Sequence, residues 1–313
     1  MSKHIVSFDS NGITVAGHLY LPEQATAASG RAGRAAPGPA VVVGHPGTGV
    51  KEQASGLYAQ KLAAAGFVAL AFDAAYQGES GGAPRGLEDP AQRIEDFKAA
   101  VSYLTTRDEV DPERIGALGI CASGGYVLNA AAGDHRIKAV GTVSAADVAR
   151  QFRFGADGAQ DPAVFQGLLD LAAAARTAEA RGEVVEPLNL FPATADEARA
   201  AGGEHAAEGF DYYRTPRGEH PRSPGIMPWP SVDRMATFDA FAAVPLIRQP
   251  LLMLVGSRAV TAWMTLDAFQ RATGPKRLHW LDGASHVDTY DKLEYVDPAV
   301  EELAGFYTAS LAR

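Results

Sequence analysis

The stretch that decides the fold runs Asp111-Pro-Glu-Arg-Ile-Gly-Ala-Leu-Gly-Ile-Cys-Ala-Ser-Gly-Gly-Tyr126. It joins an apolar run, residues 115–120, to a segment of small residues that is typical of a helix packed closely on a strand. Small residues flank Cys121, with Gly119 before it and Ser123 after it. So tight a turn holds its apex side chain above the sheet and directs the next backbone N–H at a developing oxyanion. The stretch therefore predicts a nucleophile at a strand-to-helix turn.

Two alignments of this turn are open, because Cys121 or Ser123 could stand at its apex. With Ser123 at the apex, Cys121 would have to replace the first small residue, so the alignment with Cys121 at the apex is favoured. Cys121 is the only cysteine of the chain, which excludes an internal disulfide. Outside a strand-to-helix turn of this kind, a lone cysteine is more often a small buried side chain than a reactive thiol. A helix that begins beside it lowers the pKa of a thiol, which predicts a thiolate here.

Short apolar runs alternate with helical segments through most of the chain. Buried strands are expected at residues 40–43, 67–72, 115–120, 137–143, 251–255 and 278–281. Helices are expected at residues 53–65, 89–106, 122–132 and 298–311. This alternation is typical of a mostly parallel sheet with helices on both faces, preceded here by a hairpin that turns at Asn11-Gly12. Ligands of such sheets bind beyond the carboxyl ends of the strands, so the residues just after each run are the candidates for chemistry.

One long stretch, residues 149–245, interrupts this alternation. It is rich in Ala, Gly, Pro and charge, with helices expected at residues 162–180 and 195–208. We therefore expect a core of residues 1–148 and 246–313, with residues 149–245 inserted as a cap over the sheet. Residues 26–39, rich in Ala, Gly and Pro, are expected to form a surface loop without chemistry.

Composition narrows the class of partner. The 313 residues carry a net charge of −9, which argues against nucleic acid and against an anionic membrane surface. No apolar stretch approaches the ~18 residues of a membrane span, and the first residues lack the apolar run of a secretory signal. These features lead us to expect a cytoplasmic protein that binds neither nucleic acid nor membrane.

The turn Gly119-x-Cys121-x-Ser123-Gly124 resembles that of the dienelactone hydrolases, which are α/β hydrolases, and that of fungal polyketide transferases with a cysteine at its apex. The resemblance implies an α/β-hydrolase fold and a catalytic triad of Cys, His and Asp. In that fold the nucleophile typically follows an Arg at the start of its strand by seven residues, which is the spacing of Arg114 and Cys121. Ser123 stands where dienelactone hydrolases usually have Gly, and that family lacks a long cap. The substrate of the dienelactone hydrolases therefore cannot be assigned to this chain from the resemblance.

His286 is the predicted base, because Gly283-Ala-Ser-His286 follows the last apolar run and Gly-x-x-His is the usual setting of the base in this fold. A neighbouring His can hold a cysteine as a thiolate in an ion pair. No carboxylate stands at the usual place after residues 251–255, so the predicted acid is Asp147, after the fourth run. The competing interpretation of Asp147 is a helix N-cap. Asp288 and a dyad without an acid remain as alternatives.

The predicted oxyanion hole consists of the backbone N–H groups of Gly47 and Ala122, since Pro46 has no N–H to donate. Two such groups stabilise a tetrahedral oxyanion by roughly 3–4 kcal/mol each. The candidate substrate contacts are Thr48, Tyr76, Tyr213 and Trp263. For each of them, packing in a loop, in the cap or in the core is the competing interpretation.

These residues together predict an acyl-transfer enzyme. Cys121 attacks a carbonyl, His286 moves the proton, and water or an alcohol resolves the acyl-enzyme. The expected substrate is a small-molecule ester, lactone or thioester, and neither a cofactor nor a metal is expected. Hydrolysis is favoured. The alternatives are an acyltransferase that passes a polyketide-like acyl group to an alcohol, and a non-catalytic binding protein that keeps the fold. A homodimer is left open.

Overall fold

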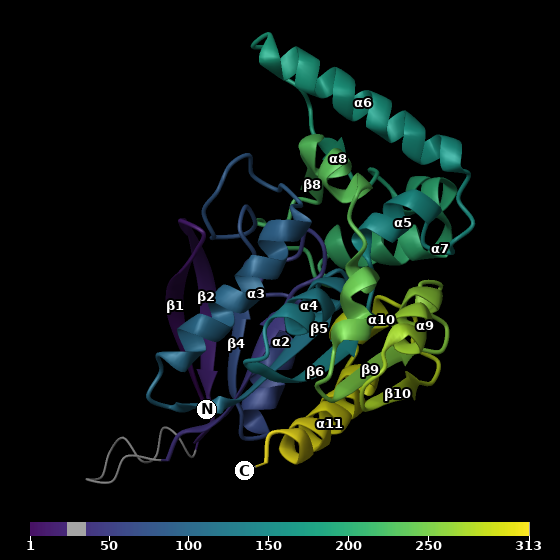
Figure 1. Ribbon diagram of the computed structural model, residues 1–313. Coiled ribbons are helices and arrows are strands. Elements are labelled where there is room, and N and C mark those ends of the chain that lie inside the picture. Colours follow the sequence, from purple (N-terminus) through teal and green to yellow (C-terminus); the bar gives the residue numbers. More distant parts are fainter. Residues whose placement is uncertain (24–35, 313) are drawn as a thin grey trace.

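An eight-stranded sheet forms the centre of the protein, in the order β1-β2-β4-β3-β5-β6-β9-β10 (Figure 1). The computed structural model describes residues 1–23 and 36–312, so most of the loop predicted at residues 26–39 lies outside the described residues. The strands are β1 (Ser2–Ser10), β2 (Ile13–Leu21), β3 (Gly38–Gly44), β4 (Val68–Phe72), β5 (Val110–Ile120), β6 (Ile137–Val143), β9 (Leu251–Gly256) and β10 (Lys276–Leu281). β2 pairs antiparallel with β1 and with β4, and the other neighbours are parallel. The predicted mostly parallel sheet is confirmed.

The first two strands form the predicted hairpin. Its two-residue loop is Asn11-Gly12, because Ser10 pairs with Ile13. Both loop residues have positive φ, 53° at Asn11 and 80° at Gly12. This left-handed geometry matches the twist of the flanking strands, which is why Asn-Gly is favoured in such turns.

Helices cover both faces of the sheet. In β3, Val42 packs into the apolar core on one face, whereas Val41 and Val43 pack into the core on the other. Successive side chains of a strand point to opposite faces, so a strand buried on both sides is apolar throughout. The first face is covered by α3 (Pro90–Thr105), α4 (Ser123–Gly133) and α9 (Ala262–Arg271), and the second by α2 (Ala54–Ala64) and α11 (Leu293–Ser310).

The last helix begins earlier than the sequence predicts. The expected start is Pro298, because proline is common in the first turn of a helix. α11 instead begins at Leu293, and Pro298 lies inside it. Proline there removes one backbone hydrogen bond and crowds the carbonyl four residues earlier, and the buried packing of Val296, Leu303 and other α11 side chains on the sheet opposes this cost.

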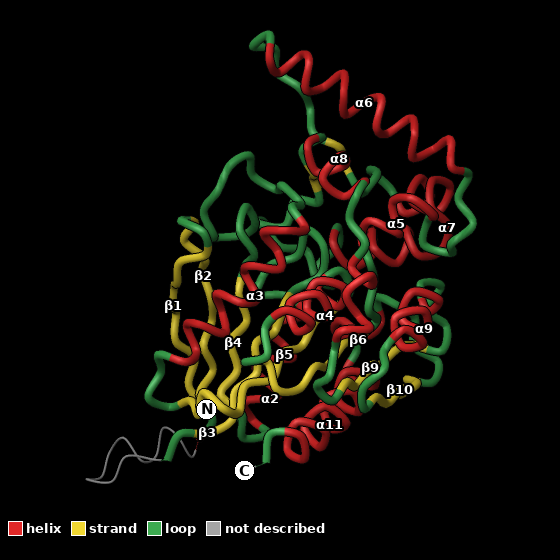
Figure 2. Tube along the Cα trace, in the orientation of Figure 1, coloured by secondary structure: helices red, strands yellow, loops and turns green. Residues whose placement is uncertain are grey.

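The predicted cap segment, residues 149–245, connects β6 to β9. Its elements are α5 (Val148–Phe154), α6 (Pro162–Ala180), β7 (Leu188–Asn189), α7 (Ala195–Tyr213), β8 (Ile226–Met227), α8 (Pro230–Ala236) and the 3-10 helix η2 (Ala240–Leu246). Helices α5 to α8 gather beyond one end of the sheet, with α6 outermost, and the two termini lie toward the opposite end (Figures 1 and 2). Within the described residues no helix, α6 and α7 included, is long and apolar enough to cross a membrane.

Candidate active site

Cys121 stands at the turn between β5 and α4. Its φ of 55° lies in the left-handed region, which residues with a side chain adopt rarely and mostly at functional sites. Its N–H donates to the carbonyl oxygen of Val143 in the neighbouring strand, at 3.0 Å. The turn is so close-packed that a Cβ on Gly119 would lie 2.1 Å from the carbonyl oxygen of Ser123. The backbone therefore has the strained strand-to-helix geometry of a nucleophile turn, with Cys121 at its apex.

Ser123, the alternative apex residue, has a different position. It is the first residue of α4, its side chain is buried, and its hydroxyl donates to the carbonyl oxygen of His45 at 2.5 Å. The buried guanidinium of Arg93 donates to the same oxygen at 3.1 Å and to Nε2 of His45 at 3.0 Å. His45 opens the turn that contains Gly47. Ser123 and Arg93 therefore fix that turn from inside the core.

Two backbone N–H groups lie beside the Cys121 sulfur. Those of Gly47 and Ala122 both lower the pKa of the thiol. The two residues follow the neighbouring parallel strands β3 and β5, and a Cβ on Gly47 would lie 3.7 Å from the Cβ of Ala122. Such a pair of donors beside a nucleophile is the arrangement that holds the oxygen of an attacked carbonyl.

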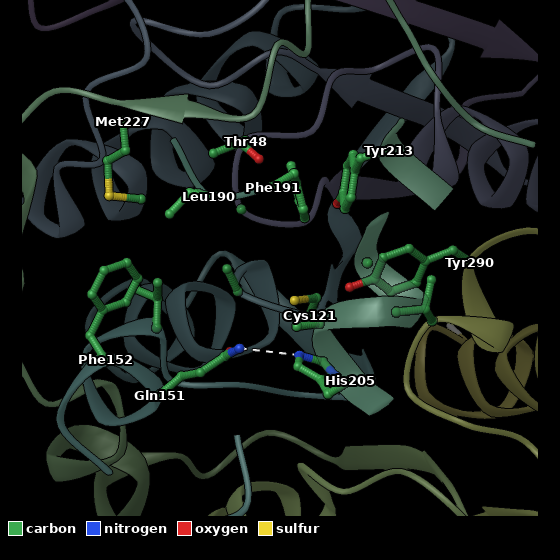
Figure 3. A pocket seen from close by; sticks show the side chains of 16 residues that line it. Thr48, Cys121, Gln151, Phe152, Leu190, Phe191, His205, Tyr213, Met227 and Tyr290 are labelled. Carbon is green, nitrogen blue, oxygen red and sulfur yellow. Dashed lines mark hydrogen bonds between the residues drawn. The ribbon is translucent and has the colours of Figure 1, made fainter. Parts of the chain in front are cut away.

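Tyr290 lies between Cys121 and His286. The Tyr290 hydroxyl is directed at the Cys121 sulfur in Figure 3, where it lowers the pKa of the thiol, and it lies 3.0 Å from Nε2 of His286. On the other side of the ring, Nδ1 of His286 lies 2.5 Å from Oγ1 of Thr261. Thr261 follows β9, His286 follows β10, and Tyr290 belongs to the short helix α10 (Asp288–Asp291). Tyr290 thus stands between the predicted nucleophile and the predicted base.

Burial favours the neutral forms of both groups. It raises the pKa of the Cys121 thiol, although Tyr290, the backbone N–H groups and the charge of Arg93 act in the opposite direction. Burial, and then the proximity of His205, hold the pKa of His286 well below its ordinary value. The resting pair is therefore a thiol and a neutral imidazole. This differs from the expected thiolate ion pair, because desolvation of Cys121 outweighs the opposing effects of Tyr290, the backbone N–H groups and Arg93.

The structure does not bring Asp147 to His286. The Asp147 carboxylate caps α5 by accepting from the N–H groups of Ala149 and Arg150, and it accepts a third hydrogen bond from Ala240 at 2.9 Å. β6 does lie beside β9, as the expectation requires. The chain after β6 turns into α5, however, and Asp147 begins that helix, which was its competing interpretation.

The place beside Nδ1 of His286 belongs to Thr261 instead. Among the residues that the structure describes, the ring of His286 has Thr261 and Tyr290 as hydrogen-bond partners. Asp288, the alternative acid, accepts from the N–H of Ser285 and pairs with Lys292 at 2.6 Å. The ring of His286, the predicted base, therefore has a neutral hydroxyl beside Nδ1 and not a carboxylate.

A pocket of about 220 Å³ opens onto Cys121 between the core and the cap segment (Figure 3). Its walls are formed by Gly47, Thr48, Cys121, Ala122, Val148, Gln151, Phe152, Leu190, Phe191, His205, Ala206, Gly209, Tyr213, Met227, Val287 and Tyr290. Of the predicted substrate contacts, Thr48 and Tyr213 belong to this lining. Trp263 packs on the core and donates to the carbonyl oxygen of Ala156, while the backbone of Tyr76 closes a loop with Gly81. Within the described part of the chain, no group of three His, Cys, Asp or Glu side chains could hold a metal ion.

Three residues of the site escape the sequence analysis. Thr261 lies in the segment after β9 where an acid is usual, but a hydroxyl there has no motif of its own. Tyr290 follows His286 by one helical turn, a spacing that predicts contact only once a helix is known to begin there. His205 lies in the cap segment, where no strand end marks a functional position.

Comparison with known proteins identifies the family of this α/β protein. Residues 26–145 match the model of the dienelactone hydrolase family. YcjY, an uncharacterised protein of Escherichia coli strain K12, is 42% identical over 274 residues, which cover 87% of this chain and 89% of YcjY. The chain therefore belongs to the dienelactone hydrolase family of the α/β-hydrolase superfamily.

Two further relatives extend this result. PA2218, an uncharacterised protein of Pseudomonas aeruginosa, is 37% identical over 313 residues, covering 96% of this chain and 78% of PA2218. Its crystal structure aligns with a TM-score of 0.88 at 35% identity, over 99% of this chain and 94% of that chain, which confirms the predicted α/β-hydrolase fold. The thiohydrolase aneE of Aspergillus aculeatus is 35% identical over 130 residues, 42% of this chain and 37% of its own.

Proposed function

We propose that the protein is an acyl-transfer hydrolase in which Cys121 forms the acyl-enzyme. The observation that carries this proposal is the position of Tyr290, which is directed at Cys121 and hydrogen-bonded to His286, with the N–H groups of Gly47 and Ala122 beside the sulfur. Membership of the dienelactone hydrolase family supports hydrolysis. The similarity to a fungal thiohydrolase supports thioesters as substrates beside esters and lactones. The small, mostly apolar pocket favours a compact acyl group.

In the acylation step, the thiol proton of Cys121 passes to the Tyr290 oxygen while the Tyr290 hydroxyl proton passes to Nε2 of His286. Tyr290 is neutral before and after this transfer. The thiolate attacks the carbonyl carbon, and the N–H groups of Gly47 and Ala122 hold the oxyanion. When the carbonyl re-forms, the bond to the leaving group breaks and the imidazolium returns the proton to that group along the same path.

In the deacylation step, water attacks the thioester carbon on Cys121. Its proton passes through Tyr290 to His286, and collapse of the tetrahedral adduct releases the acid and the Cys121 thiolate. The proton then returns to the sulfur, so the resting thiol and imidazole are restored. An alcohol that takes the place of water would give an ester by the same steps.

Thr261 takes the place of the triad acid in this proposal. Its oxygen accepts the Nδ1–H of His286, which fixes the tautomer whose Nε2 lone pair faces Tyr290. A hydroxyl stabilises an imidazolium less than a carboxylate does, and a thiol nucleophile needs less of that help than a serine. Asp147, in contrast, is assigned the capping of α5.

Mass spectrometry with acyl thioesters of N-acetylcysteamine tests the proposal. An acyl adduct on Cys121 and release of the free thiol are expected with butanoyl and hexanoyl chains, and neither with Cys121→Ala. In Ser123→Ala, the matched variant at the alternative apex, the adduct is expected to remain on Cys121. An adduct on Ser123, or full turnover by Cys121→Ala, would contradict the assignment. No adduct and no turnover with any ester or thioester would favour the non-catalytic alternative.

The pH dependence of alkylation gives an independent check on the nucleophile. The raised pKa of Cys121 means that little thiolate exists at pH 7. Below that pKa the thiolate fraction grows tenfold per pH unit, so labelling by iodoacetamide should be slow at pH 7 and about tenfold faster at pH 8. A rate that is already high and constant from pH 6 to 8 would show a preformed thiolate, which the proposed resting state excludes.

A further inference from the structure

The side chain of His45 lies behind the turn that carries Gly47, and the proposed proton path does not use it. His45 directly follows β3 and precedes Pro46 and Gly47. Its side chain is fully buried, whereas Gly47 lines the pocket beside Cys121. Burying a polar ring is unfavourable unless its nitrogen atoms are hydrogen-bonded, so the partners of these two atoms indicate what the ring does.

Nε2 of His45 is surrounded by donors. The N–H of Ala74, in the loop after β4, donates to it at 3.0 Å. The guanidinium of Arg93 in α3 lies 3.0 Å from Nε2 and 3.4 Å from Nδ1, and it pairs with the buried carboxylate of Glu88 at 3.1 Å. Both donors lack a lone pair, so Nε2 accepts and carries no proton. Burial, and then the charge of Arg93, hold the pKa of His45 well below its ordinary value, so the ring is neutral near pH 7 with its proton on Nδ1.

Nδ1 of His45 donates this proton to the carbonyl oxygen of Pro46, at 2.6 Å. The same oxygen accepts from the N–H of Gly49 at 3.1 Å. The Pro46 carbonyl and the Gly47 N–H belong to one planar trans peptide group, so they point in opposite directions. Donors that hold the carbonyl on the buried side therefore direct the N–H to the side of Cys121. Hydrogen bonds to a carbonyl also polarise its peptide group, which makes the N–H a stronger donor.

We propose that His45 is a positioning residue of the oxyanion hole, whose Nδ1–H holds the Pro46 carbonyl and thereby sets the direction of the Gly47 N–H. Arg93 acts through His45, because its contact with Nε2 restricts the ring proton to Nδ1. The inference rests on the proposed function, because it takes Gly47 as a donor to the carbonyl that Cys121 attacks. His45 should then matter for acylation and not for alkylation, because the displacement of iodide by a thiolate forms no oxyanion.

The rates of acylation and alkylation of Cys121, measured on the same variants, test this inference. Release of free thiol from the butanoyl thioester of N-acetylcysteamine gives the first rate, and labelling by iodoacetamide gives the second. In His45→Leu, acylation should slow by about 10–100-fold relative to alkylation. This is less than the 10²–10³-fold loss that follows removal of an oxyanion donor, because the Gly47 N–H remains and only its direction is no longer held.

Two amide variants show whether the donor at Nδ1 is what matters. His45→Asn places an amide N–H near the position of Nδ1, so most of the native ratio of acylation to alkylation should return. His45→Gln places its amide near the position of Nε2 and leaves Pro46 without a side-chain donor, so its ratio should resemble that of His45→Leu. His279→Leu is the matched control, because His279 lies in β10 near Glu302, at 3.8 Å, and should keep the native ratio. If His45→Leu fails to fold, the two amide variants still decide the question.

A native ratio in His45→Leu would overturn the inference, as would equal ratios in His45→Asn and His45→Gln. Equal losses of acylation and alkylation in His45→Leu would overturn it too, because they would indicate a general loss of the folded site. A failure of the proposed function gives a different result, since the native protein itself would then form no acyl adduct on Cys121 with the butanoyl thioester.

Discussion

At the scale of single residues, the site has hydroxyl groups where a Cys-His-Asp triad has charged groups. Thr261 orients the ring of His286, and Tyr290 connects that ring to Cys121. Every member of the chain is neutral at rest, so no buried ion pair has to be maintained in the small pocket. In the proposed mechanism the thiol becomes nucleophilic only when its proton leaves through Tyr290, which makes Tyr290 the residue most open to a direct test.

Tyr290→Phe removes the hydroxyl that links Cys121 to His286. Acylation of Cys121 should slow by about 10²–10³-fold, because a phenyl ring cannot pass a proton and positioned acid–base groups contribute 10²–10⁴-fold. The ring itself should stay in place, since it packs edge-to-face on Tyr212. Release of free thiol from a butanoyl thioester in a stopped-flow experiment measures the rate.

The matched control is Tyr58→Phe, which removes a buried hydroxyl that donates to the carbonyl oxygen of Thr289 at 2.8 Å, outside the proton path. It should lower stability by about 1 kcal/mol with little effect on acylation. Native-like acylation in Tyr290→Phe would mean that Cys121 transfers its proton directly to His286, and the relay would have to be abandoned.

Site residues whose positions follow from backbone geometry are predicted well from the sequence. Site residues whose positions follow from side-chain contacts are predicted less well. Cys121, Gly47 and Ala122 lie together as expected, because their positions follow from the ends of neighbouring parallel strands. Asp147 does not reach His286, because the direction of the chain after β6 is a tertiary property. Thr261 has no sequence signal, because a threonine after a strand is common and only the folded ring of His286 gives it a role.

At the scale of elements, the β5–α4 turn combines strain with close packing. The positive φ of Cys121 is maintained because α4 presses against β5 and β6, where Gly119 and Gly124 leave no room for a side chain. A Cβ on Gly124 would lie 2.7 Å from the Cα of Ala145. Small residues on both sides of the apex are thus a packing requirement, which explains why this stretch alone predicts the fold.

Gly119→Ala tests that requirement. The new methyl would meet the carbonyl oxygen of Ser123 at 2.1 Å, a backbone atom that cannot move without shifting α4. The free energy of unfolding should fall by about 1–3 kcal/mol, which is the cost of overpacking a core. Acylation of Cys121, which stands at this turn, should be lost as well. Guanidinium unfolding followed by tryptophan fluorescence measures the first effect.

Gly133→Ala provides the comparison at the other end of α4, where a Cβ meets nothing within 4 Å. Alanine favours a helix over glycine, so this variant should match or exceed the native stability by up to about 1 kcal/mol. Equal losses in the two variants would show that the tight packing at the apex is not what restrains the turn.

At the scale of the whole molecule, a buried charge network ties the cap segment to the core. Lys51, which is fully buried, lies 2.8 Å from Asp73, 2.6 Å from Glu79 and 2.9 Å from Glu52. Arg222 of the cap segment pairs with the same two glutamates, at 2.6 Å for Glu52 and 3.1 Å for Glu79. The network therefore joins the loops after β3 and β4 to the chain that closes the pocket.

The same contact region bears on the active site. Ser223, next to Arg222, donates to the carbonyl oxygen of Thr48 at 2.7 Å. Thr48 follows Gly47, which lines the pocket beside Cys121 and lowers the pKa of its thiol. The cap segment thus holds the oxyanion turn from outside, while Ser123 and Arg93 hold it from inside. The contacts of Arg222 and Ser223 could not be predicted from the sequence, because they join segments about 170 residues apart with no local pattern.

Lys51→Met tests the network as a unit. It removes the cation but leaves the Asp73 carboxylate fully buried. Removing one partner of a buried ion pair lowers the free energy of unfolding by about 3–5 kcal/mol.

Lys61→Met is the matched control, since Lys61 pairs with Asp297 in a more exposed position and such pairs contribute about 0–1 kcal/mol. The double variant Lys51→Met/Asp73→Asn should recover part of the loss, because the uncompensated charge is gone and the two sites are in contact. Guanidinium unfolding of the three variants measures these differences. If Lys51→Met were no more destabilising than Lys61→Met, the buried charges would not be what joins the cap segment to the core, and Ser223 would be the contact of the cap segment that holds the oxyanion turn.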